Sequence, residues 1–312
     1  MKVAIFGGTG FVGNYIVSEL IKNNYSVTAL VREGSENKLD DADKCNIVNG
    51  DIEDVEVVEQ VIKEAEAVIY NIGIIREFKS KGITYDKLHF DGAKLVIDLC
   101  KKHHIDRFIM MSANGVKSNG TGYQRTKYDA DIHLKNNIKN WTIIRPSLVF
   151  GDPDGKKEFC SELKKDMLSL PFPAPSFFSG VNIFSAGKFR MSPVHVKDVA
   201  KIFVDCIENN HSFKKVYELG GKSFTWNEII SIISNSYRKS IIPKFTVPAP
   251  AIFIYLMALL LDRFSWFPIS RDQITMLLEG NTCESAQIFK RYNIKPIAFK
   301  SENLSYLLNG KK

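Results

Sequence analysis

The sequence is poor in cysteine and lacks cysteine pairs. Its 312 residues include five cysteines, which are far apart and form no C-x-x-C motif: Cys45, Cys100, Cys160, Cys206 and Cys283. This spacing excludes the usual disulfide scaffolds and zinc sites. The six histidines also lack metal-ligand spacing, so we expect no bound metal.

The N-terminus lacks the features of a signal peptide. Met1-Lys2 runs directly into the short apolar stretch Val3–Phe6 and then into glycines, without an apolar core or a small-residue cleavage site. We therefore expect a cytoplasmic protein, either free or peripheral on the inner face of a membrane.

Excess basic charge is absent from the N-terminal half. The net charge is +7, but residues 1–155 carry 20 basic and 22 acidic side chains, whereas residues 156–312 carry 22 and 13. The basic residues form short pairs rather than a stripe interleaved with aromatics, so we expect no nucleic-acid partner. Anionic ligands or an anionic membrane surface suit this distribution better.

The apolar run at 245–261 is too short for a confident membrane span. Its 17 residues are uncharged but include Pro248 and Pro250, and a span needs about 20 apolar residues. A helix starting near Pro250 is apolar on all sides, which leaves two interpretations. It is a core helix that lines a substrate pocket, or it lies in a bilayer interface with aromatic anchors up to residue 267.

Short β-branched runs alternate with helical patterns in the first half of the chain. The predicted strands are 3–6, 26–31, 67–70, 107–111 and 141–145, and the predicted helices are 12–22, 55–64, 86–103 and 127–136. This rhythm is typical of an α/β fold with a doubly wound parallel sheet.

A glycine-rich turn follows the first predicted strand. Gly7, Gly10 and Gly13 have G-x-x-G-x-x-G spacing where the first helix opens. Glycines there permit a tight turn, close approach of the backbone to a pyrophosphate and close helix–sheet packing. We therefore predict a Rossmann-type dinucleotide site.

The end of the second predicted strand bears on the choice of dinucleotide. A ribose-binding acid is expected there in an NAD site, but the strand ends in Arg32 followed by Glu33. Because Arg32 can pair with a 2′-phosphate, NADP(H) is favoured, while Glu33 leaves NAD(H) open. Asp51 is placed either to reach the adenine end of the cofactor or to cap the next helix.

The regular alternation of predicted strands and helices ends after Gly151. A Pro- and Phe-rich stretch at 171–178 is typical of a loop, and the chain from Lys222 onward is helical and apolar. We predict a Rossmann domain over 1–154, to which 190–221 returns with one more strand at 216–219. A smaller, mostly helical lobe for substrate or partner comprises 155–189 and 222–312.

A Tyr, Lys and Ser set points to proton transfer. Tyr123 and Lys127 form Y-x-x-x-K at the start of a helix, and Ser112 ends the preceding strand. The i, i+4 spacing puts Tyr123 and Lys127 on one face, where an ammonium stabilises the phenolate and lowers its pKa. Ser112 would hydrogen-bond the same substrate oxygen.

Taken together, these motifs resemble the short-chain dehydrogenase/reductase superfamily, in its extended and atypical epimerase/dehydratase-like branch. The matching motifs are GGTGFVG, Gly50-Asp51, Tyr70-Asn71-Ile72-Gly73, Ser112, Tyr123/Lys127, Ile144-Arg145-Pro146-Ser147 and Pro193–Ala200. The resemblance implies that Tyr123 exchanges the proton, that Lys127 also holds the nicotinamide ribose, and that Ser112 orients the substrate. It implies cofactor contacts at Gly7, Thr9, Gly10, Phe11, Val12, Gly13, Arg32, Asp51, Ile52, Asn71, Gly73, Lys127, Pro146 and Ser147.

The C-terminal part resembles the group around the nucleotide-binding accessory subunit of respiratory complex I. The motifs are 189–196, Tyr217–Gly221 with Phe224-Thr225-Trp226, and a Pro-led apolar helix followed by Asp272-Gln273. Mitochondrial members of this group resemble structural subunits that hold a cofactor.

Three functions therefore remain open. The first is an NAD(P)-dependent oxidoreductase acting on the carbonyl or alcohol of an apolar, quinone-, isoprenoid- or lipid-like substrate, because an apolar lobe closing over the nicotinamide implies such a substrate. The second is a non-catalytic, cofactor-binding subunit of a respiratory complex, attached through 245–267. The third is an epimerase or dehydratase that recycles its cofactor.

Overall fold

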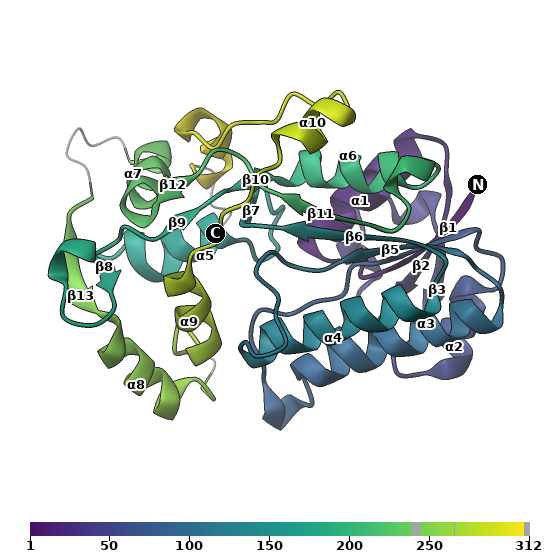
Figure 1. Cartoon of the computed structure of the whole chain (residues 1–312), viewed down its shortest axis with the longest axis horizontal. Helices are drawn as coiled ribbons and strands as arrows, with labels where there is room; N and C mark the ends of the chain where they lie inside the picture. The colour runs from purple at the N-terminus through teal and green to yellow at the C-terminus, as the bar shows by residue number, and fades with distance from the viewer. Residues whose placement is uncertain (239–243, 265, 309–312) are drawn as a thin grey trace.

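A parallel sheet covered by helices on both faces forms the larger part of the protein, and a small lobe adjoins one end (Figure 1). The computed structural model describes residues 1–238, 244–264 and 266–308. The seven sheet strands are β1 (Lys2–Phe6), β2 (Ser26–Val31), β3 (Asn46–Asn49), β4 (Ala67–Tyr70), β5 (Arg107–Met111), β6 (Asn140–Pro146) and β11 (Lys215–Leu219). Their order is β11-β6-β5-β4-β1-β2-β3, and every pairing is parallel. The predicted doubly wound sheet is confirmed.

Two layers of helices bury the two faces of this sheet. The helices are α1 (Phe11–Lys22), α2 (Val55–Ile62), α3 (Gly92–Lys102), α4 (Gly122–Asn137) and α6 (Val196–Cys206). One hydrophobic cluster joins α1 and α6 to the sheet, and a second joins α2, α3 and α4 to the opposite face (Figure 1). The strands are short apolar runs because both of their faces are covered.

The sheet topology positions a site at the carboxyl ends of the central strands. The chain runs outward from β1 to β3 and then returns to β4 on the other side of β1. Ligands bind in open α/β sheets at such a reversal of strand order. Loops that follow β1, β4 and β5 therefore meet at one edge.

Helix α4 begins five residues before the predicted start at Lys127. Thr121 caps its first turn by accepting from the Gln124 N–H, and the Gln124 side chain accepts from the Thr121 N–H. This reciprocal capping box starts the helix early. Tyr123 consequently lies in the first helical turn, one turn before Lys127.

The small lobe combines short helices with three two-stranded pairings. Its helices are α5 (Phe159–Leu163), α7 (Trp226–Tyr237), α8 (Ala251–Leu261), α9 (Arg271–Glu279) and α10 (Ala286–Arg291), the last of which packs back on the sheet domain. The pairings are β8 (Ala174–Phe178) with β13 (Thr246–Pro250), β9 (Arg190–Met191) with β12 (Phe224–Thr225), and β10 (Val194–His195) with β7 (Val149–Phe150).

The predicted loop at 171–178 is wrong for residues 174–178, which form strand β8. Ala174 and Phe177 are buried, and β8 pairs in parallel with β13 over five residues. Prolines occur in both strands, which a two-stranded sheet tolerates because each strand has an open edge.

The interpretation of the apolar helix as a core helix is also wrong. Helix α8 begins at Ala251, as the proline predicted, but only Ala251 and Ala258 are buried. Ile252, Phe253 and Leu260 are 56%, 62% and 68% exposed. In the described part of the chain, no helix combines the length and the apolar character that crossing a membrane requires.

Candidate functional site

The glycine turn between β1 and α1 leaves no room for side chains at two of its positions. Gly7 has φ +88°, and a Cβ there would lie 2.8 Å from the carbonyl carbon of Asn71. A Cβ on Gly13 would lie 2.0 Å from the Gly7 carbonyl oxygen. The Asn71 side-chain amide also donates to that oxygen at 3.3 Å. The turn is therefore held tightly against the end of β4.

The N-terminus of α1 fits the pyrophosphate of a dinucleotide. Its N-cap is Gly10, and no described side chain caps the first turn, which also contains no acid. A Cβ on exposed Gly10 would meet only the Gly7 oxygen, at 3.5 Å. Free backbone N–H groups and the positive end of the helix dipole favour an anion there. Thr9, Phe11 and Val12 are partly buried around this turn.

Arg32 and Glu33 follow the last residue of β2, and both are exposed. This edge of the sheet also carries the glycine turn, because β2 neighbours β1 in parallel register. Arg32 therefore follows β2 at the same edge of the sheet as the glycine turn.

Asp51 does not cap α2, so that interpretation is wrong. The cap is Asp54, whose carboxylate accepts from the Glu56 and Val57 N–H groups at 3.0 and 3.2 Å. Asp51 is exposed after β3 and accepts from the Glu53 N–H at 3.3 Å. The neighbouring Ile52 is 4% exposed and belongs to the core.

Lys127 lies buried between the loops that follow β4 and β5. Its Nζ donates to the Met111 carbonyl at 3.2 Å, and a Cβ on Gly73 would lie 3.3 Å from the same nitrogen. Burial lowers the pKa of Lys127 to about 8, although Asp131 partly opposes the shift. Lys127 thus stands at the switch point of the sheet with an amine that titrates near neutral pH.

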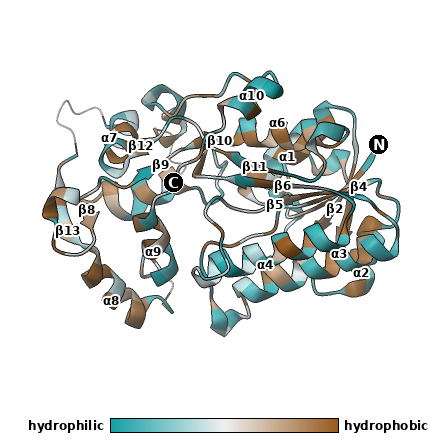
Figure 2. Ribbon diagram, viewed as in Figure 1, coloured by the Kyte–Doolittle hydropathy of each residue, from teal (hydrophilic) through white to brown (hydrophobic). Residues whose placement is uncertain are grey.

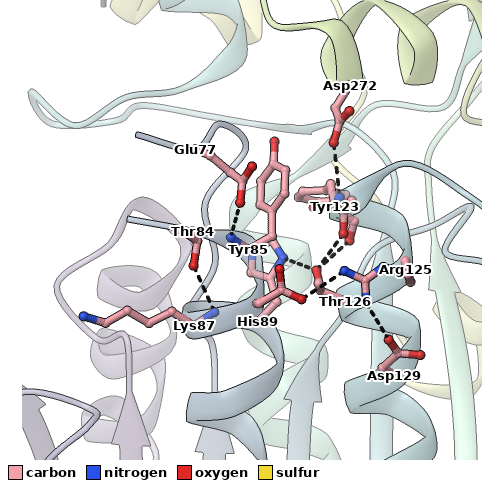
Figure 3. Close-up of polar contacts among 12 residues, drawn as sticks. Glu77, Thr84, Tyr85, Lys87, His89, Tyr123, Arg125, Thr126, Asp129 and Asp272 are labelled. Atoms are coloured by element: carbon pink, nitrogen blue, oxygen red, sulfur yellow. Dashed lines mark hydrogen bonds and ion pairs between the residues drawn. The ribbon is translucent and has the colours of Figure 1, made fainter. Parts of the chain in front are cut away.

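Tyr123 packs into an aromatic cluster with two residues of the segment that precedes α3 (Figure 3). Its ring meets the rings of Tyr85 and His89 edge to face at 5.8 and 5.1 Å, and Tyr85 stacks on His89 at 5.2 Å. Lys127 Nζ lies 5.8 Å from the centre of the Tyr123 ring.

The pKa of Tyr123 differs from the expectation. Burial raises it to about 12, whereas the sequence predicted that Lys127 would lower it. The physical reason is that Lys127 is buried and Tyr123 is largely withdrawn from water, so desolvation favours the neutral form of each. Tyr123 therefore carries its phenolic proton at pH 7.

His89 is a member of the site that the sequence did not reveal. Its Nε2 accepts from the Ile74 N–H at 3.0 Å, and Nδ1 lies 3.1 Å from Thr126 Oγ, which donates to the Gly122 carbonyl (Figure 3). These contacts require a neutral ring protonated on Nδ1. Burial accordingly lowers the pKa of His89 well below its usual value. His89 thus fixes the first turn of α4 against the β4 loop.

Ser112 is held by a buried ion pair. Its hydroxyl donates to Asp131 Oδ2 at 3.0 Å, and the same oxygen accepts from Arg145 Nε and a terminal Arg145 nitrogen at 3.0 and 2.7 Å. Ser112 and Lys127 line the same small void. Because the Ser112 hydroxyl donates its hydrogen bond to Asp131, its oxygen can only accept a hydrogen bond from a ligand at this site.

Pro146 and Ser147 connect the sheet to the C-terminal segment. The Pro146 carbonyl accepts from the Asn114 N–H at 3.0 Å, and Ser147 Oγ donates to the Asn281 carbonyl at 2.7 Å. Pro146 is the last residue of β6 and Ser147 directly follows it, at the edge that holds the Ser112 and Lys127 loops.

A cavity of about 380 Å³ opens beside the first turn of α4. The loop from Lys117 to Thr121 forms one wall, and Tyr255 of α8 with Arg271, Asp272 and Glu279 of α9 forms another. Four of the nine lining residues are charged, and most of the others are polar. The cavity therefore lies between the Rossmann domain and the small lobe and suits a polar group. Among the described residues, no cluster of His, Cys, Asp or Glu side chains has the grouping needed to hold a metal ion.

Comparison with known families assigns the class of protein. Residues 7–168, more than half of the chain, match the family described as NAD(P)H-binding. The chain therefore belongs to the NAD(P)H-binding family, within the epimerase/dehydratase-like branch of the short-chain dehydrogenase/reductase superfamily.

Curated relatives include subunits of a respiratory enzyme. The chain is 26% identical over 283 residues to the mitochondrial NADH dehydrogenase [ubiquinone] 1 alpha subcomplex subunit 9 of Dictyostelium discoideum, covering 88% of this chain and 74% of that protein. It is 24% identical over 311 residues to the mitochondrial NADH-ubiquinone oxidoreductase 40 kDa subunit of Neurospora crassa, covering 97% and 78%. A ceramide reductase of Caulobacter vibrioides is 22% identical and covers 73% and 68%.

Solved structures confirm the fold. The UDP-glucose 4-epimerase of Thermotoga maritima with UDP-glucose superposes with a TM-score of 0.70 at 18% identity, covering 99% of this chain and 98% of that one. The UDP-glucose 4-epimerase of Thermus thermophilus in complex with NAD gives 0.71 at 15% identity, with the same coverage.

Proposed function

We propose that the protein is an NADP(H)-dependent oxidoreductase that transfers hydride between the nicotinamide and a carbonyl or alcohol carbon of a lipid-like substrate. The observation that carries this proposal is the position of Tyr123 and Lys127. Tyr123 lies in the first turn of α4, and Lys127 lies one turn later, against Gly73 and the Met111 carbonyl at the switch point of the sheet.

Separate residues of this chain would bind the separate parts of the dinucleotide. The bound dinucleotide would supply or accept the hydride. The N-terminus of α1 binds its pyrophosphate, and Arg32 pairs with the 2′-phosphate that distinguishes NADP(H). Lys127 holds the ribose hydroxyls. Asp51, Ile52, Asn71, Gly73, Pro146 and Ser147 complete the proposed cofactor contacts.

Tyr123 donates the proton to the substrate in this proposal. Because its pKa is raised to about 12, the phenol is protonated at pH 7 and can donate to a carbonyl oxygen that gains negative charge as hydride arrives. Lys127, whose pKa is about 8, stabilises that charge from one helical turn away when it is protonated. In the opposite direction Ser112, fixed by Asp131, orients an alcohol substrate by accepting a hydrogen bond from its hydroxyl group.

Two features of the small lobe support the proposed substrate class. A polar group beside the carbonyl would occupy the charged cavity near Thr121, and an apolar chain would extend along Tyr255 towards exposed α8. One relative is named a ceramide reductase, and because ceramide is a lipid this name supports the proposed substrate class.

The test is NADPH oxidation by the wild type and Tyr123→Phe, with a membrane lipid extract as the substrate source. Tyr123→Phe is expected to bind NADPH like the wild type and to lose turnover. Equal turnover by both proteins would contradict the assignment of Tyr123 as proton donor.

A second candidate function is favoured by the respiratory subunits among the relatives and by the exposed apolar side chains of residues 245–264 and of Trp266. In this alternative the chain is a cofactor-binding subunit of a respiratory complex, and the dinucleotide stabilises its fold. NADPH binding without oxidation, together with comigration with a respiratory complex on native gels, would support it and contradict the first. Cofactor recycling by an epimerase or dehydratase is a third, weaker option, favoured by the epimerase structures.

A further inference from the structure

The exposed apolar side chains of the protein gather on one end of the small lobe. Of the 21 large apolar side chains exposed among the described residues, 16 lie in 170–184 or 245–266. We call the described residues of these two segments the apolar tip. In Figure 2 the brown α8 marks this end of the molecule, away from the sheet.

The two segments form one surface. Strand β8 pairs with β13 along its whole length, the Ala174 N–H donates to the Phe245 carbonyl at 2.8 Å, and Lys244 Nζ donates to the Leu170 carbonyl. Helix α8 follows β13 directly. The exposed side chains therefore belong to a folded unit rather than to separate loops.

Helix α8 is exposed around more of its circumference than a protein partner covers. Seven of its eleven residues are exposed large apolar side chains. At about 100° per residue, these seven side chains cover an arc of about 200° when viewed along the helix axis. Tyr255 lies at one end of this arc and Met257 at the other. A helix that packs on another protein needs an apolar stripe of about 100°. The hydrocarbon of a bilayer surrounds an embedded helix and so matches the wider arc.

The rim of the apolar tip carries the charge that an anionic bilayer attracts. The described residues between 238 and 271 include four basic side chains and one acid, and residues 167–187 include no charged side chain. Arg263 is exposed and lies over the Phe264 ring at 4.9 Å. Trp266 is 69% exposed and stacks on Phe264 at 6.1 Å. Aromatic rings beside basic groups are typical of the headgroup region.

We propose that the apolar tip inserts into the interface of an anionic phospholipid bilayer, with α8 lying among the acyl chains and Trp266 and Arg263 at the headgroups. The contact goes beyond the proposed function, because it needs neither a reactive Tyr123 nor a bound dinucleotide. It places the cavity lined by Tyr255 at the membrane surface.

The test is cosedimentation with phospholipid vesicles. Wild type is expected to pellet with vesicles of phosphatidylcholine mixed with phosphatidylglycerol, and to pellet less with pure phosphatidylcholine or at raised salt. Replacing Ile252, Phe253, Leu256 and Leu260 with serine should lower the partition constant at least about tenfold. These side chains are exposed, so the variant should keep its fold and its melting temperature.

A matched control replaces exposed apolar residues elsewhere. Val55→Ser with Ile132→Ser changes side chains that are 50% and 36% exposed, outside the apolar tip, and vesicle binding should not change. Trp266 fluorescence should shift to the blue on vesicle addition, and the shift should be absent in Trp266→Phe.

Two outcomes would overturn the proposal. One is a wild type that stays in the supernatant with anionic vesicles. The other is equal binding by the wild type and the quadruple serine variant. A dimer that the same serine substitutions dissociate, without vesicle binding, would instead identify a second copy of this chain as the occupant. Tyr123→Phe should bind vesicles like the wild type, so failure of the proposed chemistry and failure of this proposal are distinguishable.

Discussion

The carboxylate of Asp272 accepts a hydrogen bond from the backbone N–H of Tyr123 at 3.3 Å (Figure 3). Asp272 belongs to α9 of the small lobe, and Tyr123 belongs to the first turn of α4 in the Rossmann domain. A negative charge at a helix N-terminus interacts favourably with the free N–H groups and with the helix dipole. The small lobe therefore contacts Tyr123, the residue proposed to donate the proton, through the tyrosine backbone.

Asp272→Ala should lower turnover about tenfold, because a shifted first turn of α4 misplaces the Tyr123 hydroxyl. Asp272→Asn keeps an acceptor oxygen, so its turnover should fall less than that of Asp272→Ala. Steady-state NADPH oxidation measures both, and the exposed Glu284→Gln serves as the control. If Asp272→Ala turned over like the wild type, the contact would be structural only.

Gly13→Ala and Gly10→Ala should separate folding from cofactor binding. A Cβ at position 13 would lie 2.0 Å from a backbone oxygen, so Gly13→Ala should lower the free energy of unfolding by several kcal/mol. A Cβ at position 10 has space, so Gly10→Ala should keep its melting temperature but bind NADPH about tenfold more weakly, because the added methyl group holds the phosphates away from α1. Thermal unfolding and fluorescence titration measure the two effects. Unchanged NADPH affinity in Gly10→Ala would contradict the proposed pyrophosphate position.

Arg32→Asp should reverse the dinucleotide preference. The substitution removes the partner of the 2′-phosphate and supplies an acceptor for ribose hydroxyls, so NADPH affinity should fall at least about tenfold and NADH affinity should rise. Lys139→Asp makes the same change of charge at an exposed position before β6 and should alter neither affinity. Equal affinity of the wild type for both dinucleotides would contradict the NADP(H) assignment.

Lys127→Met should stabilise the protein at pH 7 while abolishing turnover. The pKa of Lys127 is about 8 in the fold against the ordinary lysine value of 10.5, so the unfolded chain holds this proton more tightly. Below pH 8 the buried charge costs about 3 kcal/mol relative to a neutral side chain, and the cost disappears between pH 8 and 10.5.

Chemical denaturation at pH 7 and at pH 10.5 checks the Lys127 prediction. The difference in the free energy of unfolding between Lys127→Met and the wild type should be positive at pH 7 and should shrink towards pH 10.5. A difference that does not vary with pH would show that Lys127 is not desolvated in the fold.

The sequence predicted the sheet domain well because its signals are local. Strands β4 and β5 have the predicted bounds, and the glycine turn lies between β1 and α1 as the spacing indicated. Each of these elements is a short apolar run or a tight turn whose residues interact mainly with near neighbours. The early start of α4 was missed, although Thr121 and Gln124 form a recognisable capping box.

The rest of the site depends on contacts between distant parts of the chain. His89 precedes Thr126 by 37 residues, and Asp272 follows Tyr123 by 149. No local pattern marks such partners. The elevated pKa of Tyr123 likewise follows from burial, which a sequence motif does not report. The exposure of α8 could not be predicted because an all-apolar helix suits either a core or a membrane interface.

The most direct measurement for the proposed function is isotope transfer from NADPH. The protein is incubated with a membrane lipid extract and NADPH carrying deuterium at either face of C4, and the lipids are analysed by mass spectrometry. The account predicts that one lipid class gains a single deuterium from one of the two labelled faces with wild type, and gains none with Tyr123→Phe. No deuterated lipid with wild type, although NADPH binds, would contradict it.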